Sequence, residues 1–420
     1  MRDDEFKSIA AAARTMDQQT HPPSPVLSER RLLLLLAAVQ FTQIMDFMVM
    51  MPLGPQLMRQ LAISPPQFAS LISSFAITAG IVGLATAPFM DRFDRKHLLL
   101  FSYAGFTLGT LACGLSESWQ MLLISRAVCG AFGGMSGATI MAIASDLVPP
   151  HRRARGMAII MTAFSVAAAL GVPFGLKLAQ IWRWEAPFLA VAAIAAVVWI
   201  LLFRVLPPVR VHLADGKVRS ARDFLLLLKD GNAWRGLVLM MAVVFGHFTV
   251  IPLLSPFLVR NVGMLEKDLF LVYMVGGAVT VFTGPLVGKL SDRFGKFRIY
   301  TILVFGASTV IYVLTSSQAR PEWQVLMIAG FFFMLASARF IPTQATISMA
   351  VPAARRGAYM SLVACSRDIA SGITTSVGSL VVTEGARGQL IGYDRLGLLA
   401  IGVSIVSLWF FRRVKSAEAT

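Results

Sequence analysis

Residues 31–57 read RLLLLLAAVQFTQIMDFMVMMPLGPQL, and this stretch decides the fold class of the chain. It is long enough to cross a bilayer, because a hydrocarbon core of about 30 Å requires roughly 20 apolar residues in a helix. One carboxylate, Asp46, lies near its middle, and Arg31 at its start is too distant to pair with it. An aspartate at the centre of a membrane helix costs on the order of 2.5 to 3.5 kcal/mol. We therefore expect Asp46 either to face a cavity or to pair with a charge on another helix.

The composition indicates a membrane protein. Of the 420 residues, 56 % are hydrophobic and only 14 % are charged, and the mean hydropathy is +0.70. Soluble domains are typically about 45–50 % apolar and 25 % charged. The excess forms long apolar blocks, which predict an all-α polytopic membrane protein with twelve transmembrane helices. The blocks cover residues 32–55, 67–90, 97–115, 119–147, 156–180, 187–206, 235–257, 267–290, 299–317, 322–350, 357–383 and 393–411.

Basic residues mark every second junction between these blocks. They crowd the junctions after even-numbered blocks, at residues 92–97, 151–155, 293–298 and 355–356, and they are sparse after odd-numbered blocks. By the positive-inside rule, this asymmetry predicts that both termini are cytoplasmic. The formal net charge of +16 is therefore interpreted as a topology signal, and nucleic-acid binding is not expected.

The longest polar connection separates six blocks from six. Its middle, Ala221–Lys229, is either an amphipathic helix on the membrane surface or a solvated linker. The three cysteines all lie in apolar blocks, which favours packing residues over a disulfide or metal framework. We expect a cytoplasmic tail at 1–30, a six-helix bundle at 31–206, a cytoplasmic linker at 207–234, a second six-helix bundle at 235–412 and a cytoplasmic tail at 413–420.

The two halves repeat each other in sequence. Asp91-Arg92-Phe93 recurs 201 positions later as Asp292-Arg293-Phe294, and Gly171 recurs at the same offset as Gly372. Several landmarks at one offset indicate an internal duplication, here of two pseudo-symmetric six-helix bundles. Duplicated bundles of this kind are typical of secondary transporters, which bind their substrate between the halves.

The same offset assigns an equivalent residue in the second half to Asp46. Position 46 corresponds to position 247, which is His247 in the seventh block. The two titratable groups would then lie near the midplane in equivalent helices. The alternative for His247 is a neutral imidazole bonded to a backbone or hydroxyl group.

Several motifs resemble one known family. Gly288-Lys-Leu-Ser-Asp292-Arg293-Phe-Gly295-Lys296 is close to a complete Gly-x-x-x-Asp-Arg-x-Gly-Arg-Lys loop. The first copy keeps Asp91, Arg92, Arg95 and Lys96 but has Ala87 and Asp94 in place of the glycines. A fourth-block arginine, Arg126, precedes a run of glycines, and the fifth block contains Gly171-Val-Pro173-Phe-Gly175. Together these residues resemble the major facilitator superfamily, specifically its proton-coupled drug-antiporter and sugar-efflux exporters.

The resemblance implies roles for these motifs. The loop residues would latch the cytoplasmic ends together when the outside is open, although their basic residues also fix topology. Arg126 would be the membrane-embedded arginine of the fourth helix, and Asp46 is our leading candidate for its acceptor. Gly171, Pro173 and Gly175 would form a bending point in the fifth helix, because glycine and proline weaken the backbone hydrogen-bond ladder.

Further charges lie at membrane depth in the second half. Arg339 precedes Gln344 by about a turn, and Arg367 adjoins Asp368. Adjacent helical residues point about 100° apart, so we expect Arg367 and Asp368 to pair poorly with each other. Arg339 would face the cavity or, alternatively, bond to Asp368 from the tenth helix. We expect the substrate cavity to include these four residues together with Gln40, Gln43, Met50, Phe245, His247 and Tyr273.

These features predict a secondary active transporter of a bacterial-type inner membrane, working as a monomer by alternating access. Asp46, Arg126 and His247 would couple proton entry to efflux of an amphipathic small molecule, since the expected lining is mostly apolar. The alternatives are an uncoupled or differently coupled carrier of a lysolipid- or sphingolipid-like molecule, a sugar or metabolite exporter and, more remotely, a transporter-like ligand sensor. The sequence contains no phosphate-binding loop, metal-ligand cluster or nucleophile elbow, so we expect no enzyme, metal or cofactor.

Overall fold

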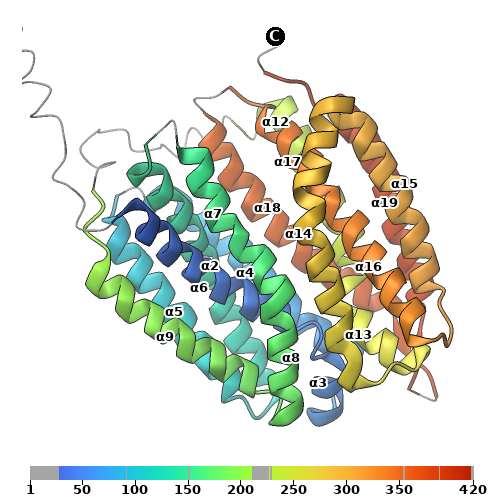
Figure 1. The fold of residues 1–420 in the computed structure, drawn as a ribbon. Coiled ribbons are helices and arrows are strands. Elements are labelled where there is room, and N and C mark those ends of the chain that lie inside the picture. The colour runs from blue at the N-terminus through green and yellow to red at the C-terminus, as the bar shows by residue number, and fades with distance from the viewer. Residues whose placement is uncertain are drawn as a thin grey trace, which may run out of the picture.

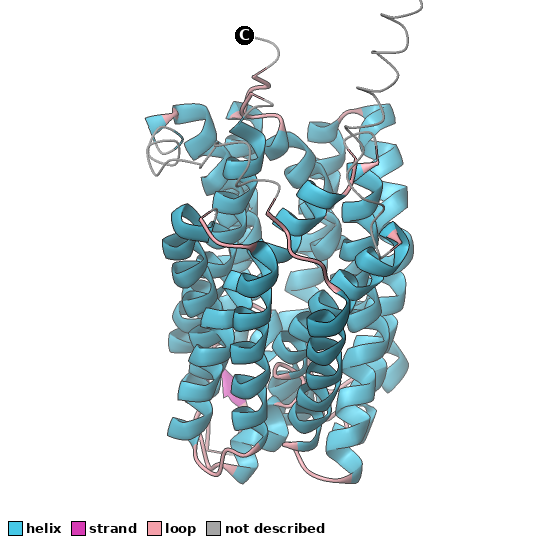
Figure 2. Cartoon of the chain, turned by 90° about the vertical axis from the view of Figure 1, so that its left-hand side faces the viewer, coloured by secondary structure: helices cyan, strands magenta, loops and turns pink. Residues whose placement is uncertain are grey.

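A computed structural model describes residues 28–90, 92–149, 152–210, 227, 229–352, 355–386 and 388–417. Its long helices run between two opposite faces of the molecule (Figures 1 and 2). Within the described ranges, eleven helices are long and apolar enough to cross a membrane. The twelfth long helix, α18 (Arg356–Val381), contains Arg367, Asp368 and a series of serines and threonines. Residues 1–27 of the predicted tail at 1–30 and most of the possible helix at 221–229 lie outside the described residues, and α2 begins within the last residues of that tail, at Glu29.

The N-terminal half contains helices α2 to α9. They are α2 (Glu29–Val49), α3 (Gly54–Gln60), α4 (Pro65–Met90), α5 (Arg95–Gly114), α6 (Trp119–Leu147), α7 (Arg153–Val166), the π-helical η1 (Ala167–Gly171), α8 (Val172–Ile181) and α9 (Ala186–Val205). The first membrane segment therefore consists of α2 and α3, and the fifth consists of α7, η1 and α8.

The C-terminal half repeats this plan. Its elements are α12 (Gly231–Phe248), η2 (Ile251–Leu253), α13 (Leu254–Phe257), η3 (Leu258–Val262), η4 (Glu266–Asp268), α14 (Leu269–Phe294), α15 (Lys296–Thr315), α16 (Glu322–Ala338), α17 (Phe340–Ser348), α18 and α19 (Tyr393–Arg413). Two short antiparallel strands, β1 (Thr383–Glu384) and β2 (Leu390–Ile391), pair between α18 and α19. The prediction of an all-α protein with twelve long helices in two bundles is confirmed.

We name the two faces by the elements that end there. The linker face is where α2 begins at Glu29, α9 ends at Val205 and α19 ends at Arg413. The far face contains α3, η4 and the paired strands. In Figure 1 the linker face is at the top, where the C-terminus lies, and α3 and α13 lie at the bottom.

Short polar residues begin several of the helices. Ser28 and Ser118 accept hydrogen bonds from main-chain N–H groups in the first turns of α2 and α6. Asp230 accepts from two N–H groups of α12. Such side chains satisfy donors that the helix cannot satisfy itself, so each helix begins at a defined residue.

The first and seventh membrane segments are broken at equivalent places. Pro52 and Pro252 each lack the N–H that would continue the helix, and they follow the ends of α2 and α12. At the first break the N–H of Met50 bonds to Met48 O instead of Asp46 O, and at the second the N–H of Val250 bonds to His247 O instead of Gly246 O. These tighter turns leave the carbonyls of Asp46 and Gly246, 200 positions apart, available to other donors.

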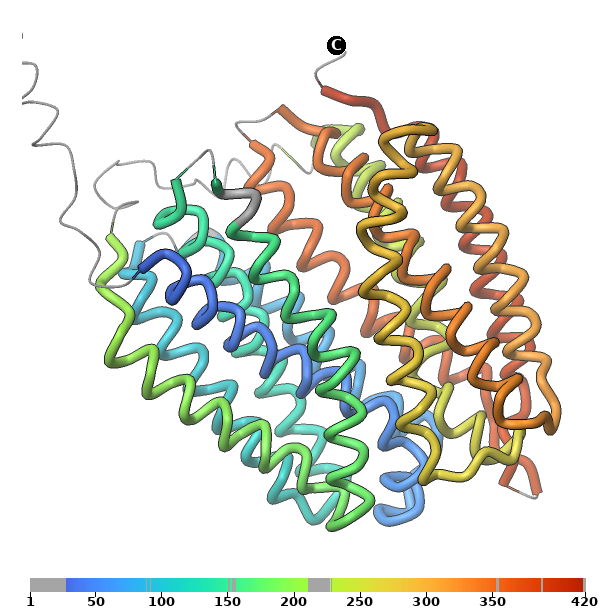
Figure 3. Tube along the Cα trace, viewed as in Figure 1, coloured from blue at the N-terminus to red at the C-terminus, as the bar shows by residue number. Residues whose placement is uncertain are grey.

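The halves meet along two pairs of long helices. Helix α4 lies against α18, and α14 lies against the segment α7–η1–α8 (Figure 3). At Gly80 an added Cβ would lie 2.5 Å from Ile369 Cγ1, and at Gly277 it would lie 2.6 Å from Ala168 O. Both glycines are therefore required by the close approach of backbones rather than by flexibility.

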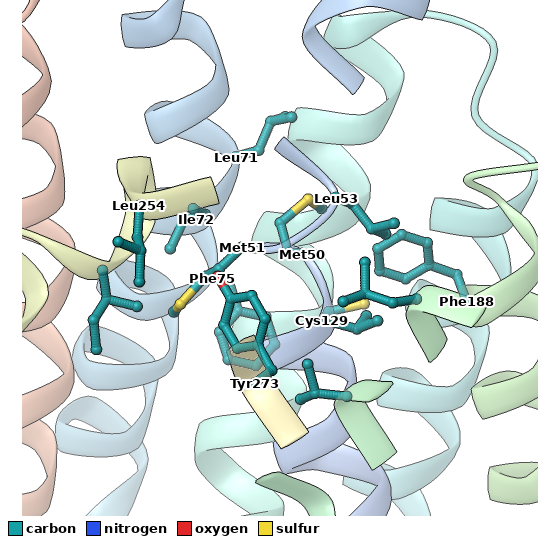
Figure 4. Packing of buried hydrophobic residues seen from close by; sticks show 14 of the residues in the cluster. Met50, Met51, Leu53, Leu71, Ile72, Phe75, Cys129, Phe188, Leu254 and Tyr273 are labelled. Carbon is teal, nitrogen blue, oxygen red and sulfur yellow. The ribbon is translucent and has the colours of Figure 1, made fainter. Parts of the chain in front are cut away.

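The largest apolar cluster joins both halves near the break after α2. Figure 4 shows Met50, Met51 and Leu53 surrounded by residues of several helices. These neighbours include Leu71, Ile72 and Phe75 of α4, Phe188 of α9, and Leu254 and Tyr273 of the C-terminal half. The halves thus share one apolar core at this level. The three cysteines are free; Cys113 and Cys129 are buried and Cys365 is half-buried.

Candidate functional site

Asp46 and Arg126 form an ion pair inside the N-terminal half. Asp46 lies one turn before the end of α2, and Arg126 lies on α6. Their side chains are both 0 % exposed, and Arg126 Nη1 lies 2.6 Å from Asp46 Oδ2. The same nitrogen donates to the Asp46 carbonyl at 3.4 Å. Arg126 therefore contacts both the carboxylate and the main chain at the break of the first segment.

The pair retains unused hydrogen-bonding capacity. Within the described residues, Asp46 Oδ1 and the Nε and Nη2 atoms of Arg126 are buried and have no hydrogen-bond partner. The guanidinium carbon lies 4.5 Å from the ring centroid of Phe75, an arrangement that stabilises the cation without satisfying its donors. A buried polar atom without a partner is costly. Asp46 Oδ1 can therefore still accept a proton or a hydrogen bond, and the Nε and Nη2 atoms of Arg126 can still donate to another polar group.

A second buried arginine occupies the C-terminal half. Arg339 lies between α16 and α17 and is 0 % exposed. Its Nη1 donates to Ser404 Oγ at 2.7 Å, its Nη2 to Gly246 O at 3.3 Å and its Nε to Ala336 O at 3.3 Å. The alternative of a bond between Arg339 and Asp368 is not observed. The carbonyl that Arg339 contacts on α12 belongs to Gly246, one residue before His247.

His247 lies among aromatic rings. It stacks on Phe332 at 6.0 Å between ring centroids and meets Phe248 and Phe340 edge-on. Its Nδ1 is buried and has no hydrogen-bond partner within the described residues. Within the described residues, Nδ1 therefore makes no bond of the kind that the alternative for His247 assumed. Phe47 and Phe248, which follow Asp46 and His247, contact each other between the halves at 6.1 Å.

The expectation that Arg367 and Asp368 pair poorly is wrong. Arg367 Nε donates to Asp368 Oδ1 at 3.0 Å, and Nη2 lies 2.9 Å from the same oxygen. The arginine side chain is long and flexible enough to turn back toward its neighbour, although the two Cβ atoms diverge. The side chains are 48 % and 30 % exposed, respectively. The two charges thus neutralise each other on α18.

The remaining predicted cavity residues differ in exposure. Gln43 donates to Ser136 Oγ on α6 and is buried, and Gln40 and Phe245 are half-buried. Met50 and Tyr273 are buried in the shared core, where the Tyr273 hydroxyl lies 2.7 Å from Ser255 Oγ. Gln344 is exposed. Gln43 therefore contacts α6, the helix that also holds Arg126, whereas Met50 and Tyr273 lie in the apolar core that the halves share.

The predicted latch residues lie at the linker face. Asp91 is outside the described residues, Arg92 lies over the Phe89 ring at 5.6 Å, and Arg293 lies over Phe294 at 5.1 Å. Gly295, with φ +90°, turns the chain between α14 and α15. No hydrogen bond or ion pair to the other half is found for the described side chains of Lys96 and Asp292, and an added Cβ at Gly288 would meet nothing within 4 Å.

Asp94, which replaces a motif glycine, links the start of α5 to the start of the linker. It caps α5 through the N–H of Lys96 at 2.9 Å and accepts from Val209 N at 3.1 Å and Arg210 Nε at 2.8 Å. Burial acts to raise the pKa of the Asp94 carboxyl, but these hydrogen bonds outweigh it, and the pKa is lowered below its usual value. The start of the linker is thereby fixed to α5. Next to it, Arg95 pairs with Asp146 of α6 at 3.0 Å.

The fifth segment changes its helical form at the predicted bending point. The chain is π-helical over Ala167–Gly171 and returns to an α-helix at Val172, with Pro173 in its first turn. Prolines and π-helical turns are both places where helices bend, and this segment contains the two side by side. Gly175 lies close to Val49, where an added Cβ would approach Val49 Cγ2 to 2.6 Å.

Sequence reasoning missed the polar contacts that join the halves at the far face. Arg59 of α3 forms a bidentate ion pair with Glu266 of η4: its Nη1 donates to Oε1, and its Nη2 lies 3.1 Å from Oε2. Gln180 of α8 donates to the carbonyls of Glu266 and Lys267, each at 3.2 Å. The only available signal was that Arg59, Gln180 and Glu266 lie at or near the ends of apolar blocks, which does not specify a partner.

Comparison with known proteins identifies relatives of the same general kind. The family model described as Major Facilitator Superfamily matches residues 36–375. A "Probable sugar efflux transporter" of Helicobacter pylori (strain P12) is 22 % identical over 342 residues, which cover 80 % of this chain and 83 % of the relative. The "Uncharacterized MFS-type transporter YceJ" of Bacillus subtilis (strain 168) is 24 % identical over 371 residues, which cover 86 % of this chain and 91 % of the relative.

Solved structures agree in fold. A bacterial homologue of the human lysosomal transporter Spinster, in an inward-facing and unoccupied conformation, superposes with a TM-score of 0.74 at 17 % identity, covering 92 % of this chain and 96 % of the other. A D-xylose-proton symporter gives a TM-score of 0.71 at 16 % identity, covering 92 % and 98 %. This is a family of multi-pass membrane transporters rather than of enzymes, and the chain belongs to the major facilitator superfamily.

Proposed function

We propose that this transporter exports an amphipathic small molecule in exchange for protons, by alternating access. The linker face would be cytoplasmic, in keeping with the basic residues at its loops. The far face, where Arg59, Gln180 and Glu266 join the halves, would be extracytoplasmic and closed in this structure. The chain would work as a monomer in a bacterial-type inner membrane.

The Asp46–Arg126 pair is the observation that carries this proposal. A carboxylate buried at 0 % exposure is stable as an anion only while a cation compensates it. A proton on Asp46 removes the attraction for Arg126, and an ionised Asp46 restores it. Because Asp46 Oδ1 has no hydrogen-bond partner in the described chain, a proton can be accepted there without breaking another bond.

The position of the pair connects protonation to the shape of the first segment. Arg126 also bonds to the Asp46 carbonyl, which the break at Pro52 leaves unused. Releasing Arg126 would free that carbonyl and loosen the link between α2 and α6. The residues after this break pack against Leu254 and Tyr273 of the other half. Protonation would thus act on the apolar contact that closes the far face.

Proton release by reconstituted protein tests the proposal. Purified chain is placed in proteoliposomes containing a pH-sensitive dye, and a panel of amphipathic dyes is added. We expect exchange of protons for at least one dye by the wild type and none by Asp46→Asn. Glu185→Gln provides the control. Glu185 lies away from the site, and its Oε1 is 3.1 Å from Nη2 of its ion-pair partner Arg183. If Asp46→Asn exchanges protons as well as the wild type does, the proposed role of Asp46 is wrong.

Export of a sugar is a second candidate, favoured by the relatives named as probable sugar efflux transporters. An uncoupled carrier of a lipid-like molecule is a third candidate. Counterflow of a labelled thiogalactoside tests the second, and flipping of a labelled lysolipid tests the third. In both cases a carrier without proton coupling should keep its transport rate in Asp46→Asn.

A further inference from the structure

Arg339 is a buried cation without a counter-anion. All three of its hydrogen-bonded nitrogens meet neutral oxygens, those of Ser404, Gly246 and Ala336. In the part of the chain that the structure describes, no carboxylate forms an ion pair with it. Its hydrogen bonds are thus satisfied while its charge is not, and an uncompensated charge at membrane depth is unfavourable.

The N-terminal half shows what is missing. There, Arg126 bonds to the freed carbonyl at the helix break and to the carboxylate of the same residue, Asp46. Arg339 bonds to the freed carbonyl at the equivalent break, but that residue is Gly246, which has no side chain. An added Cβ there would lie 2.3 Å from Ser404 Oγ. The position that would hold the matching anion is thus filled by a neutral hydroxyl.

The other membrane-depth charges do not compensate Arg339. Asp46 is paired with Arg126, and Asp368 is paired with Arg367 on its own helix. These five groups therefore leave one positive charge unmatched, and it lies on Arg339. A neutral or cationic substrate would leave that imbalance or increase it, whereas a monoanion would remove it.

The surroundings of Arg339 match an amphipathic ligand. His247 directly follows Gly246, whose carbonyl accepts a hydrogen bond from Arg339, and it has a buried Nδ1 without a hydrogen-bond partner in the described chain. The rings of Phe248, Phe332 and Phe340 surround the imidazole. A charged head at Arg339 and His247 would thus be continued by apolar surface.

Resting on the proposed function for the site between the halves, we propose that the substrate is an amphipathic organic anion. Its carboxylate, sulfonate or phosphate head is held by Arg339 and His247, and its apolar body lies along the three phenylalanines. A guanidinium is well suited to this task, because it stays charged and binds such heads through two parallel hydrogen bonds.

Binding of three matched probes tests the substrate class. A dansyl-labelled medium-chain fatty acid, its primary amide and the corresponding amine share one apolar body and differ in head charge. Their fluorescence is titrated with the purified full chain in nanodiscs made of neutral lipid. We expect the wild type to bind the acid about ten- to hundredfold more tightly than the amide, as for a charge-assisted hydrogen bond, and to bind the amine more weakly still.

Four variants separate this site from a purely structural arginine. Arg339→Gln keeps donors without the charge and should remove the preference for the acid, whereas Arg339→Lys should keep part of it. Ser404 Oγ lies 2.7 Å from Arg339 Nη1, so Ser404→Asp supplies an internal anion next to the guanidinium and should also remove the preference, whereas its uncharged match Ser404→Asn should keep it. Because Ser404→Asp adds a partner to a buried charge, it should fold even if Arg339→Gln does not.

The outcomes overturn or support the proposal without reference to transport. Equal affinity of the wild type for the acid and the amide would overturn it. So would an equal loss of both affinities in Arg339→Gln together with an unchanged preference in Ser404→Asp, because Arg339 would then only fasten helices. Anion preference without proton exchange would leave this inference intact and refute the proposed coupling. Proton exchange for a neutral dye, without anion preference, would refute this inference and leave the proposed coupling intact.

Discussion

Breaking the ion pair between Arg59 and Glu266 should open the far face of the transporter. The two side chains are 60 % and 32 % exposed, so the pair contributes only about 0.5–1 kcal/mol, the upper part of the range for exposed pairs. Since about 1.4 kcal/mol corresponds to a factor of ten, Arg59→Ala should raise the open population about two- to fivefold. Gln180→Ala removes two hydrogen bonds to the same loop and should add a comparable effect, less than additive because both changes act on Glu266.

Thiol labelling measures this population. Met50 is 0 % exposed after the break in the first segment, so a Met50→Cys reporter should react only when the far face opens. The three native cysteines are first replaced by serine, and a membrane-impermeant maleimide is added at the far face. The reporter alone gives the baseline rate. Arg59→Ala should raise that rate two- to fivefold, and Arg59→Glu combined with Glu266→Arg should return it toward the baseline.

A matched control distinguishes closure from a general surface effect. Arg183 and Glu185 also form an ion pair at the far face, at 3.1 Å, but both belong to the N-terminal half. Arg183→Ala should therefore leave the labelling rate unchanged. A labelling rate that responds equally to Arg183→Ala and Arg59→Ala would refute the idea that the contact between the halves holds the face closed. Failure of the charge swap to restore closure would refute it as well.

Three further predictions concern stability. Arg126→Leu leaves the Asp46 carboxylate buried and unpaired and should destabilise the protein by about 3–5 kcal/mol in thermal unfolding, with partial recovery in the double variant with Asp46→Asn. Asp94→Asn should cost about 1 kcal/mol at pH 7. Because the folded-state pKa of Asp94 is lowered, this contribution is present above about pH 4 and is lost as the pH falls through the folded-state pKa, so the unfolding curves of variant and wild type should converge at the acid end of a pH series. Gly277→Val pushes a Cβ into Ala168 O at 2.6 Å and should cost about 1–3 kcal/mol, whereas Gly284→Val on the same helix, with nothing within 4 Å, should be nearly neutral by the same measurement.

The fold followed from the sequence because its signals were local and repeated. Each apolar block is long enough to span a bilayer, and the predicted fourth block at 119–147 coincides with α6. The charges of Asp46 and Arg126 were also informative, since each lies in an apolar helix without a partner on that helix. A buried charge is stable only with a partner, so opposite charges on two neighbouring helices are expected to pair with each other.

Contacts that depend on side-chain conformation or on loop position could not be predicted. Arg367 and Asp368 pair because one side chain turns back, and the angle between adjacent residues on a helix does not reveal this. Arg59 and Glu266 are 207 positions apart, in the short helices α3 and η4, where no periodic pattern links one to the other. The offset of 201 assigned His247 to Asp46, whereas the breaks at Pro52 and Pro252 are 200 apart and align Asp46 with Gly246. One residue of register decided whether the second half holds a titratable group or none at the equivalent place.

The two halves therefore differ in their buried charges, because the N-terminal half holds an ion pair and the C-terminal half an arginine without a counter-anion. This difference predicts how protons and substrate influence each other's binding. The N-terminal pair can lose its negative charge by protonation, whereas Arg339 keeps its positive charge throughout. An anion at Arg339 would favour the protonated form of Asp46 by simple attraction, so anion affinity should rise as the pH falls if the two sites act only through their charges. Exchange of anion for proton requires the opposite dependence, which arises only if protonation changes the shape of the site at the helix break.

Titration of a sulfonate with the same labelled apolar body between pH 8 and pH 6, where the sulfonate stays ionised, measures this dependence, and Asp46→Asn should abolish it in either case. An inside-negative potential by itself favours anion export by about 2.3 kcal/mol per 100 mV, so the accompanying transport measurement must be made with the potential clamped at zero. Under that condition, affinity that falls on acidification, together with proton release that depends on Asp46, would support exchange. Affinity that rises on acidification would refute exchange, because proton and anion would then bind together.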